Sequence, residues 1–156
     1  MSGEAGRSAR DSMVEMTEIV LPEDSNPRGA IFGGRVLALV DKCAAIAAHR
    51  HARSDVTTVS FDSVEFRHTV RVGTILILHG RLNAAFGSSM EIEVEVLAED
   101  PNTGARTRTT RALVTMVALG PDGRPAKVPP LLALNDEDRR RARDAADRRA
   151  RRLAER

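Results

Sequence analysis

The chain has 156 residues, of which 42% are apolar and 29% charged, so it is long enough for one domain with a single hydrophobic core. It contains no Trp or Tyr and only four Phe, which argues against nucleic-acid modules that stack bases on aromatic rings. A single cysteine excludes an internal disulfide framework. Because the N-terminus also lacks an apolar signal segment, we expect a cytoplasmic protein.

The N-terminal part of the chain is expected to contain one strand. Residues 1–12 show no periodic pattern and are predicted to be disordered. Residues 13–21 are typical of a strand, and the proline-containing residues 22–28 are typical of a loop.

A long apolar segment follows and is predicted to be the central helix. Apolar side chains between residues 35 and 50 cover more than one helical face, which indicates a helix buried on most of its circumference. Arg35, Asp41 and Lys42 interrupt the segment, so it is not expected to span a membrane.

Four strands are expected after this helix, at residues 56–66, 74–82, 90–98 and 106–119. The third of them alternates cleanly, with three glutamates on one face and apolar side chains on the other. The short joints between strands suit hairpins, at 72–73, 86–88 and 101–104. Four antiparallel strands, one further strand and one buried helix predict an α+β architecture.

The C-terminal part is predicted to be a charged tail outside a domain that spans residues 13–129. Residues 130–156 are Arg-rich and are expected to be helical; between 136 and 156 there are nine Arg and six acidic residues. Such a mixture is typical of a solvated helix. A nucleic-acid-binding arm is the alternative, and the interspersed acids argue against it.

The sequence contains one motif that carries chemistry. Asn26-Pro-Arg-Gly29, followed by Gly33-Gly34 and Asp41, resembles the signature of the hotdog-fold acyl-CoA thioesterases. More narrowly, it resembles the bacterial short single-domain hydrolases and the cytosolic brain-type acyl-CoA hydrolases. It continues in later segments, at Val56-Thr57-Thr58, Phe66, Val72-Gly73 and residues 86–96. The resemblance implies a hotdog fold, an antiparallel sheet wrapped around one helix, and hydrolysis of acyl-CoA to a carboxylic acid and CoA.

The residues of this motif suit attack of water on a thioester. An acid such as Asp41, surrounded by apolar residues, needs a partner or a function. We interpret it as a general base or as a nucleophile that forms a mixed anhydride; the alternative is an ion pair with Lys42 or Arg35. Backbone N–H groups at a helix N-terminus stabilise developing negative charge on oxygen, and glycines let a substrate approach them. The resemblance assigns this oxyanion role to Gly33, eight residues before Asp41.

The resemblance also implies that the site is shared between subunits. In the family the residue matching Asn26 comes from one hotdog unit and the acid from another, so we expect a homodimer, extended to a trimer of dimers. Family members contact pantetheine through the turn matching Gly87, Ser88 and Ser89. The other residues expected to contact acyl-CoA, mainly at the entrance and the phosphates, are Arg28, Phe32, Gly34, Phe66 and Arg67, with Arg71 and Arg111 as further phosphate partners.

Two other functions are possible for a protein of this fold. A non-catalytic hotdog protein that senses acyl-CoA would lack the acid, and a hotdog dehydratase would have a catalytic histidine beside it. No membrane or nucleic-acid partner is expected, the second because the net positive charge of the chain belongs to the tail and not to the folded domain. No cofactor or metal is expected either, because His49 and His51 have no third ligand nearby in the sequence. Relatives often have proline where this chain has Arg67-His68-Thr69, so contacts to the nucleotide of CoA can differ there.

Overall fold

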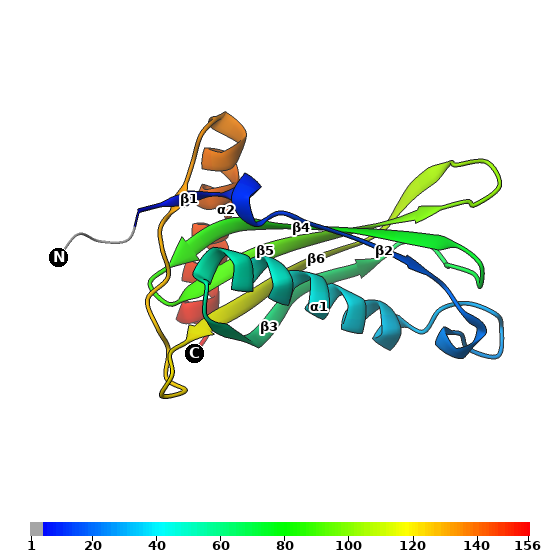
Figure 1. Cartoon of the computed structure of the whole chain (residues 1–156), viewed down its shortest axis with the longest axis horizontal. Coiled ribbons are helices and arrows are strands. Elements are labelled where there is room, and N and C mark those ends of the chain that lie inside the picture. The colour runs from blue at the N-terminus through cyan, green and yellow to red at the C-terminus, as the bar shows by residue number, and fades with distance from the viewer. Residues whose placement is uncertain (1–4) are drawn as a thin grey trace.

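The computed structural model describes residues 5–156. A five-stranded antiparallel sheet has one helix on each face, α1 in front and α2 behind (Figure 1). Helix α1 spans Gly33–Ala52 and α2 spans Asp136–Ala154. The sheet is formed, in spatial order, by β2 (Val14–Ile19), β4 (Ile75–Phe86), β5 (Ser89–Glu99), β6 (Arg106–Leu119) and β3 (Asp55–Phe66). The expected α+β hotdog architecture is confirmed.

The small residues of α1 let the sheet approach it closely. Cys43, Ala44 and Ala47 have no exposed surface, and they pack against the apolar faces of the strands. Gly80 of β4 lies where a Cβ atom would be 2.9 Å from Cys43 Sγ, so a glycine is required for this approach. Burial raises the pKa of the Cys43 thiol to about 12, so this cysteine is a packing residue rather than a nucleophile.

The sheet topology differs from the sequence prediction at one joint. The hairpins at 86–88 and 101–104 are present, because β4 pairs with β5 and β5 with β6. The prediction of a hairpin at 72–73 is wrong. Strand β3 does not pair with β4 but lies at an edge of the sheet, where it pairs with β6. The segment between β3 and β4 pairs with the loop before α1 instead. There Ile31 N donates to Val70 O at 2.8 Å, and Ala30 bridges to Arg71.

The N-terminal segment is ordered where the structure describes it. Strand β1 (Arg7–Ser8) pairs in parallel with β7 (Leu131–Leu132), and a 3-10 helix spans Ala9–Ser12. Ala9 and Ser12 are only 4% and 1% exposed. The predicted disorder is therefore wrong for residues 5–12, and residues 1–4 lie outside the described part. A second short 3-10 helix, Pro22–Asp24, occurs in the predicted loop.

The two ends of helix α2 carry residues that stabilise a helix. Asn135 is its N-cap, with a side chain that accepts a hydrogen bond from Asp138 N at 2.8 Å. Acidic residues occupy its first turn and arginines its last turn, which matches the helix dipole.

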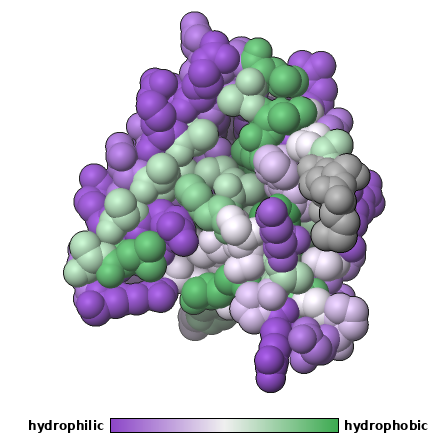
Figure 2. All heavy atoms as spheres, turned by 90° about the vertical axis from the view of Figure 1, so that its left-hand side faces the viewer, coloured by the Kyte–Doolittle hydropathy of each residue, from purple (hydrophilic) through white to green (hydrophobic). Residues whose placement is uncertain are grey.

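Helix α2 docks on the outer face of the sheet through ion pairs rather than through an apolar stripe. Arg148 pairs with Glu91 at 2.6 Å, and Arg141 with Glu93 at 3.1 Å. Glu91 is only 2% exposed, so the acidic face of β5 is covered by the helix. On this end of the molecule, hydrophilic side chains gather along the edges, and apolar side chains lie across the middle (Figure 2). The predicted tail is thus helical and packed against the domain.

Candidate active site

Asp41 lies on α1 and hydrogen-bonds to the neighbouring strand β3. Thr58 Oγ1 donates to Asp41 Oδ1 at 2.5 Å, and the same hydroxyl lies 3.5 Å from Met116 Sδ on β6. The Asp41 residue is half-buried, and it forms no ion pair with any residue between 5 and 156. Arg35, one of its possible partners, pairs with Asp24 at 3.0 Å. The alternative of an Arg35 or Lys42 ion pair is therefore not realised, and Asp41 Oδ2 remains available.

Asn26 and Gly33 line one groove near the start of α1. The groove has a volume of about 400 Å³, and Arg28, Phe66 and Arg71 also line it. Asn26 Oδ1 accepts from Arg28 N at 2.9 Å and from Ala30 N at 3.2 Å, which fixes the loop. Its Nδ2 donates to none of the described residues, so it is a free donor at the groove.

The start of α1 leaves two backbone donors available. Phe32 is the N-cap and offers no side-chain cap, while its carbonyl accepts from Arg35 N and Val36 N. Within the described chain the N–H groups of Gly33 and Gly34 donate no hydrogen bond, as expected for the first turn of a helix. These donors and the positive end of the helix dipole suit an oxyanion.

The expected entrance residues lie around this helix start. Phe32 and Phe66 are 51% and 52% exposed, and the Phe66 ring approaches Gly33. Arg67 donates to Glu65 Oε2 from Nε and Nη2, at 3.1 and 2.7 Å, and this contact lowers the pKa of the Glu65 carboxyl. The Arg67 guanidinium is thus already paired with a carboxylate of its own chain.

The predicted pantetheine turn lies elsewhere on the sheet. Gly87 and Ser88 connect β4 to β5, and Ser88 O accepts from Ala118 N at 2.9 Å. Ser89 pairs with Val117 of β6, which on its other side pairs with Thr57 of β3. The turn therefore lies at the same end of β3 as Thr58 and away from Phe66.

The predicted site residues form two groups that are far apart in one chain. Gly33 and Asp41 are separated by eight residues of helix, about 12 Å along its axis. Phe66 and Thr58 pair with β6 residues six positions apart, about 20 Å along the strand. An oxyanion donor lies about 3 Å from the carbonyl oxygen, and a base lies about 3 Å from the water that attacks the carbonyl carbon, so the two groups are at most about 10 Å apart. Gly33 and Asp41 of the same chain cannot therefore act on one carbonyl.

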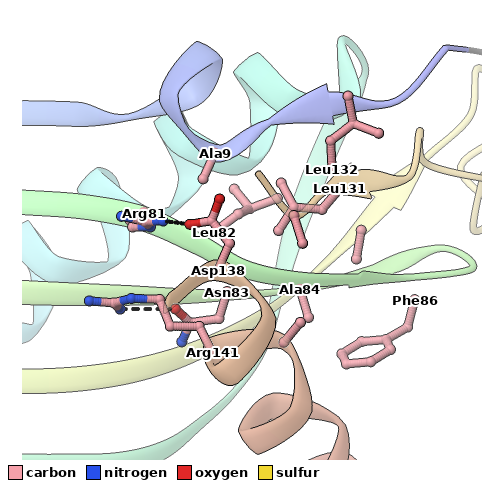
Figure 3. Close-up of a pocket in the computed structure, with 13 residues that line it drawn as sticks. Ala9, Arg81, Leu82, Asn83, Ala84, Phe86, Leu131, Leu132, Asp138 and Arg141 are labelled. Carbon is pink, nitrogen blue, oxygen red and sulfur yellow. Dashed lines mark hydrogen bonds and ion pairs between the residues drawn. The ribbon is translucent and has the colours of Figure 1, made fainter. Parts of the chain in front are cut away.

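A further cavity lies away from both groups. It has a volume of about 130 Å³ and lies between β4, β7 and α2, where Arg81 pairs with Asp138 and Arg141 Nη1 donates to Asn83 Oδ1 (Figure 3). Ala9 and the two leucines of β7 close its other side (Figure 3). It contains none of the predicted site residues.

Two general features of the described chain bear on function. Among residues 5–156 there is no group of three or more His, Cys, Asp or Glu side chains that could hold a metal ion. No helix in this part of the chain is long and apolar enough to cross a membrane.

Sequence reasoning missed Thr58 as a site residue. It occurs in a segment that matches the family pattern, but a threonine in a strand is common and carries no chemical signal by itself. Its position opposite Asp41 depends on the pairing of β3 with β6, which the sequence prediction did not contain.

Comparison with known proteins places the chain in a family. Residues 28–105 match the thioesterase superfamily. An uncharacterized acyl-CoA thioester hydrolase of Bacillus subtilis is 33% identical over 132 residues, covering 85% of this chain and 77% of that protein. The cytosolic acyl coenzyme A thioester hydrolase of Rattus norvegicus is 33% identical over 88% of this chain. The chain covers only 36% of the rat protein's length and 23% of acyl-coenzyme A thioesterase 11 of Mus musculus.

Solved structures agree with these sequence relatives. A hexameric acyl-CoA thioesterase in its apo form superimposes with a TM-score of 0.92 and 38% identity, over 97% of both chains. The acyl-CoA hydrolase of Staphylococcus aureus, solved with butyryl coenzyme A and coenzyme A, superimposes with a TM-score of 0.88 and 32% identity. The match covers 96% of this chain and 91% of that one. It has also been solved with alanine replacing an asparagine, an aspartate and a threonine, successively 15 and 17 residues apart. The chain belongs to the thioesterase superfamily, and within it to the hotdog-fold acyl-CoA thioesterases.

Proposed function

We propose that this protein hydrolyses acyl-CoA to a carboxylic acid and CoA, at sites formed by two subunits. One observation carries the proposal: each chain has an Asn26–Gly33 group and an Asp41–Thr58 group, and the two are too far apart to act together. The same spacing of 15 and 17 residues separates Asn26, Asp41 and Thr58 as separates the three residues replaced in the Staphylococcus hydrolase. The relatives named as cytosolic support a cytoplasmic location.

Strand β3 offers the surface that would bring the two groups together. It is an edge strand, and its Val59 and Phe61 side chains are 49% and 37% exposed. Unpaired edges with exposed apolar side chains favour pairing with another strand. Antiparallel pairing of β3 with its two-fold copy places the Phe66 end of one chain beside the Thr58 end of the other. Such a dimer contains two complete sites, and the hexameric relatives support a trimer of dimers.

Each half of the site then has its own role. The N–H groups of Gly33 and Gly34 and the Nδ2 of Asn26 bind the thioester carbonyl oxygen as it becomes negative. Asp41 of the partner subunit accepts a proton from the attacking water through Oδ2, because Thr58 already occupies its Oδ1. The C–S bond then breaks, and the thiolate of CoA takes the proton that Asp41 accepted, which restores the carboxylate. Gly87, Ser88 and Ser89 lie at the same end of the sheet as Thr58, with β6 between, and contact the pantetheine arm.

A subunit-mixing experiment tests the shared site. Asp41→Ala and Asn26→Ala are each expected to be nearly inactive, whereas their co-expression should give mixed dimers with one intact site. Random pairing predicts recovery of about a quarter of the wild-type activity in the unfractionated mixture. CoA release, followed with a thiol reagent, measures this in the unfractionated mixture, and dual-tag purification then isolates the mixed oligomers. If purified mixed oligomers stay as inactive as the parents, the site does not form between subunits.

The residues that line the groove indicate which arginines bind the phosphates of CoA. Arg28 and Arg71 line it and have no carboxylate partner among the described residues, whereas Arg67 is paired with Glu65. Arg71→Ala is therefore expected to raise KM for acyl-CoA about 10-fold. It should leave KM unchanged for the matching acyl-N-acetylcysteamine, which has no phosphate. Arg67→Ala is the matched control, and a larger KM effect there than in Arg71→Ala would contradict this assignment.

A further inference from the structure

The middle of β3 is irregular and is held by one carboxylate. Its pairing with β6 skips a residue twice, at Val59 and at Asp62. Such bulges lose ladder hydrogen bonds and redirect nearby side chains, and they are common next to active sites. Asp62 spans the irregular segment: its Oδ1 accepts from Ser60 Oγ at 3.3 Å, and its Oδ2 accepts from Thr115 Oγ1 of β6 at 3.2 Å.

A third donor to this carboxylate comes from the far end of the chain. Arg152, in the last turn of α2, donates from Nη1 to Asp62 Oδ2 at 2.7 Å. The two side chains are 23% and 17% exposed, so the pair is partly shielded from water and screened less than a surface pair. The ion pairs of Arg141 and Arg148 fix the rest of the helix on the sheet. The Arg152 guanidinium is thus presented to β3 from a fixed position.

The position of Thr58 depends on this segment. Thr58 directly precedes the first bulge, and β6 is the only strand of the described chain beside it. Its hydroxyl donates to Asp41 Oδ1 at 2.5 Å, and hydrogen bonds weaken steeply as their geometry worsens. A small displacement of the bulged segment would therefore release Asp41 from Thr58.

We propose that Arg152 is a positioning residue for the hydrolysis. By holding Asp62 it fixes the bulged part of β3, and so it keeps Thr58 in contact with Asp41. The inference rests on the proposed function, because it concerns the geometry of the proposed base. Arg152 does not line the groove of Asn26 and Gly33, so its effect is expected on kcat and not on KM.

A double-mutant cycle tests the coupling. Arg152→Ala and Asp62→Asn are each expected to lower kcat about 3- to 10-fold at unchanged KM, and the double variant should be no worse than either single one. Arg152→Lys should restore most of the loss, because it keeps a cation near Asp62. Arg151→Ala is the matched control. The Arg151 side chain is exposed and forms no ion pair within residues 5–156. Losses that multiply in the double variant, or an equal loss in Arg151→Ala, would overturn the proposal.

Hydrogen exchange supplies a readout that does not depend on activity. The amides of residues 58–63 should exchange faster in Arg152→Ala than in wild type or Arg151→Ala, while the melting temperature changes little. Unchanged exchange in Arg152→Ala would overturn the role of α2 in ordering β3. If the wild-type protein released no CoA from any acyl-CoA, the proposed function would fail, and the exchange result would still decide whether Arg152 orders this segment.

Discussion

Asp41→Ala is expected to lower kcat for acyl-CoA hydrolysis by about 10²- to 10⁴-fold, because it removes the proposed base for the attacking water. KM should change little, since the groove that holds the phosphates is formed by other residues. The measurement is CoA release across a series of acyl-chain lengths, followed with a thiol reagent. A series of this kind also identifies the preferred acyl chain for the wild-type protein.

Asp41→Asn separates the chemical role of this residue from its structural role. The asparagine keeps the shape of the side chain and an oxygen that accepts from Thr58, but it cannot accept the proton of water. It should therefore lose as much activity as the alanine variant while melting close to the wild-type temperature. Wild-type activity in Asp41→Ala would refute the mechanism and revive the non-catalytic acyl-CoA sensor.

Arg148→Ala is expected to cost about 3–5 kcal/mol of stability, the largest effect we predict outside the active site. Among the residues that the structure describes, it would leave Glu91, which is 2% exposed, with the Nδ2 of Asn83 as its one remaining side-chain partner, at 3.0 Å. Removing one member of a buried ion pair leaves an uncompensated charge, which costs more than the pair itself contributes. The loss should appear as a lower midpoint in urea unfolding.

Two comparisons make this prediction specific. Replacing both Arg148 and Glu91 with methionine should cost less than Arg148→Ala, because no charge is then left buried. Arg106→Ala breaks a more exposed pair with Glu99 and should cost less than about 1 kcal/mol. Equal losses in Arg106→Ala and Arg148→Ala would show that burial under α2 does not govern the energetics.

Local patterns in the sequence predicted the elements but not their partners. The alternation in β5 and the apolar circumference of α1 placed these elements within a few residues of their observed bounds. Neither pattern indicates which strand lies beside β3, because pairing with β6 joins residues about 50 positions apart. Residues 5–12 are ordered for the same reason, a contact between distant parts of the chain. Arg7 and Ser8 pair with β7, more than 120 positions away.

The resemblance predicted a site shared between subunits, with Asn26 from one chain and the acid from another, but it did not indicate on which side Gly33 acts. The motif identified Asn26, Gly33 and Asp41, and it placed the oxyanion donor eight residues before the acid as if the two could meet. The rise of an α-helix shows that they do not meet in one chain. Thr58 could not be predicted, since its contact with Asp41 depends on how β3 crosses α1.

The polar outer face of the sheet has a consequence for how the chain folds. Helix α2 follows all five strands in the sequence, so the sheet and α1 can assemble during synthesis before α2 leaves the ribosome. The surface that α2 covers carries the polar side chains of Asn83, Glu91 and Glu93. Exposed apolar surface is what makes partly folded chains aggregate. In a nascent chain that has not yet formed α2, these polar groups are therefore exposed to water, which solvates them well.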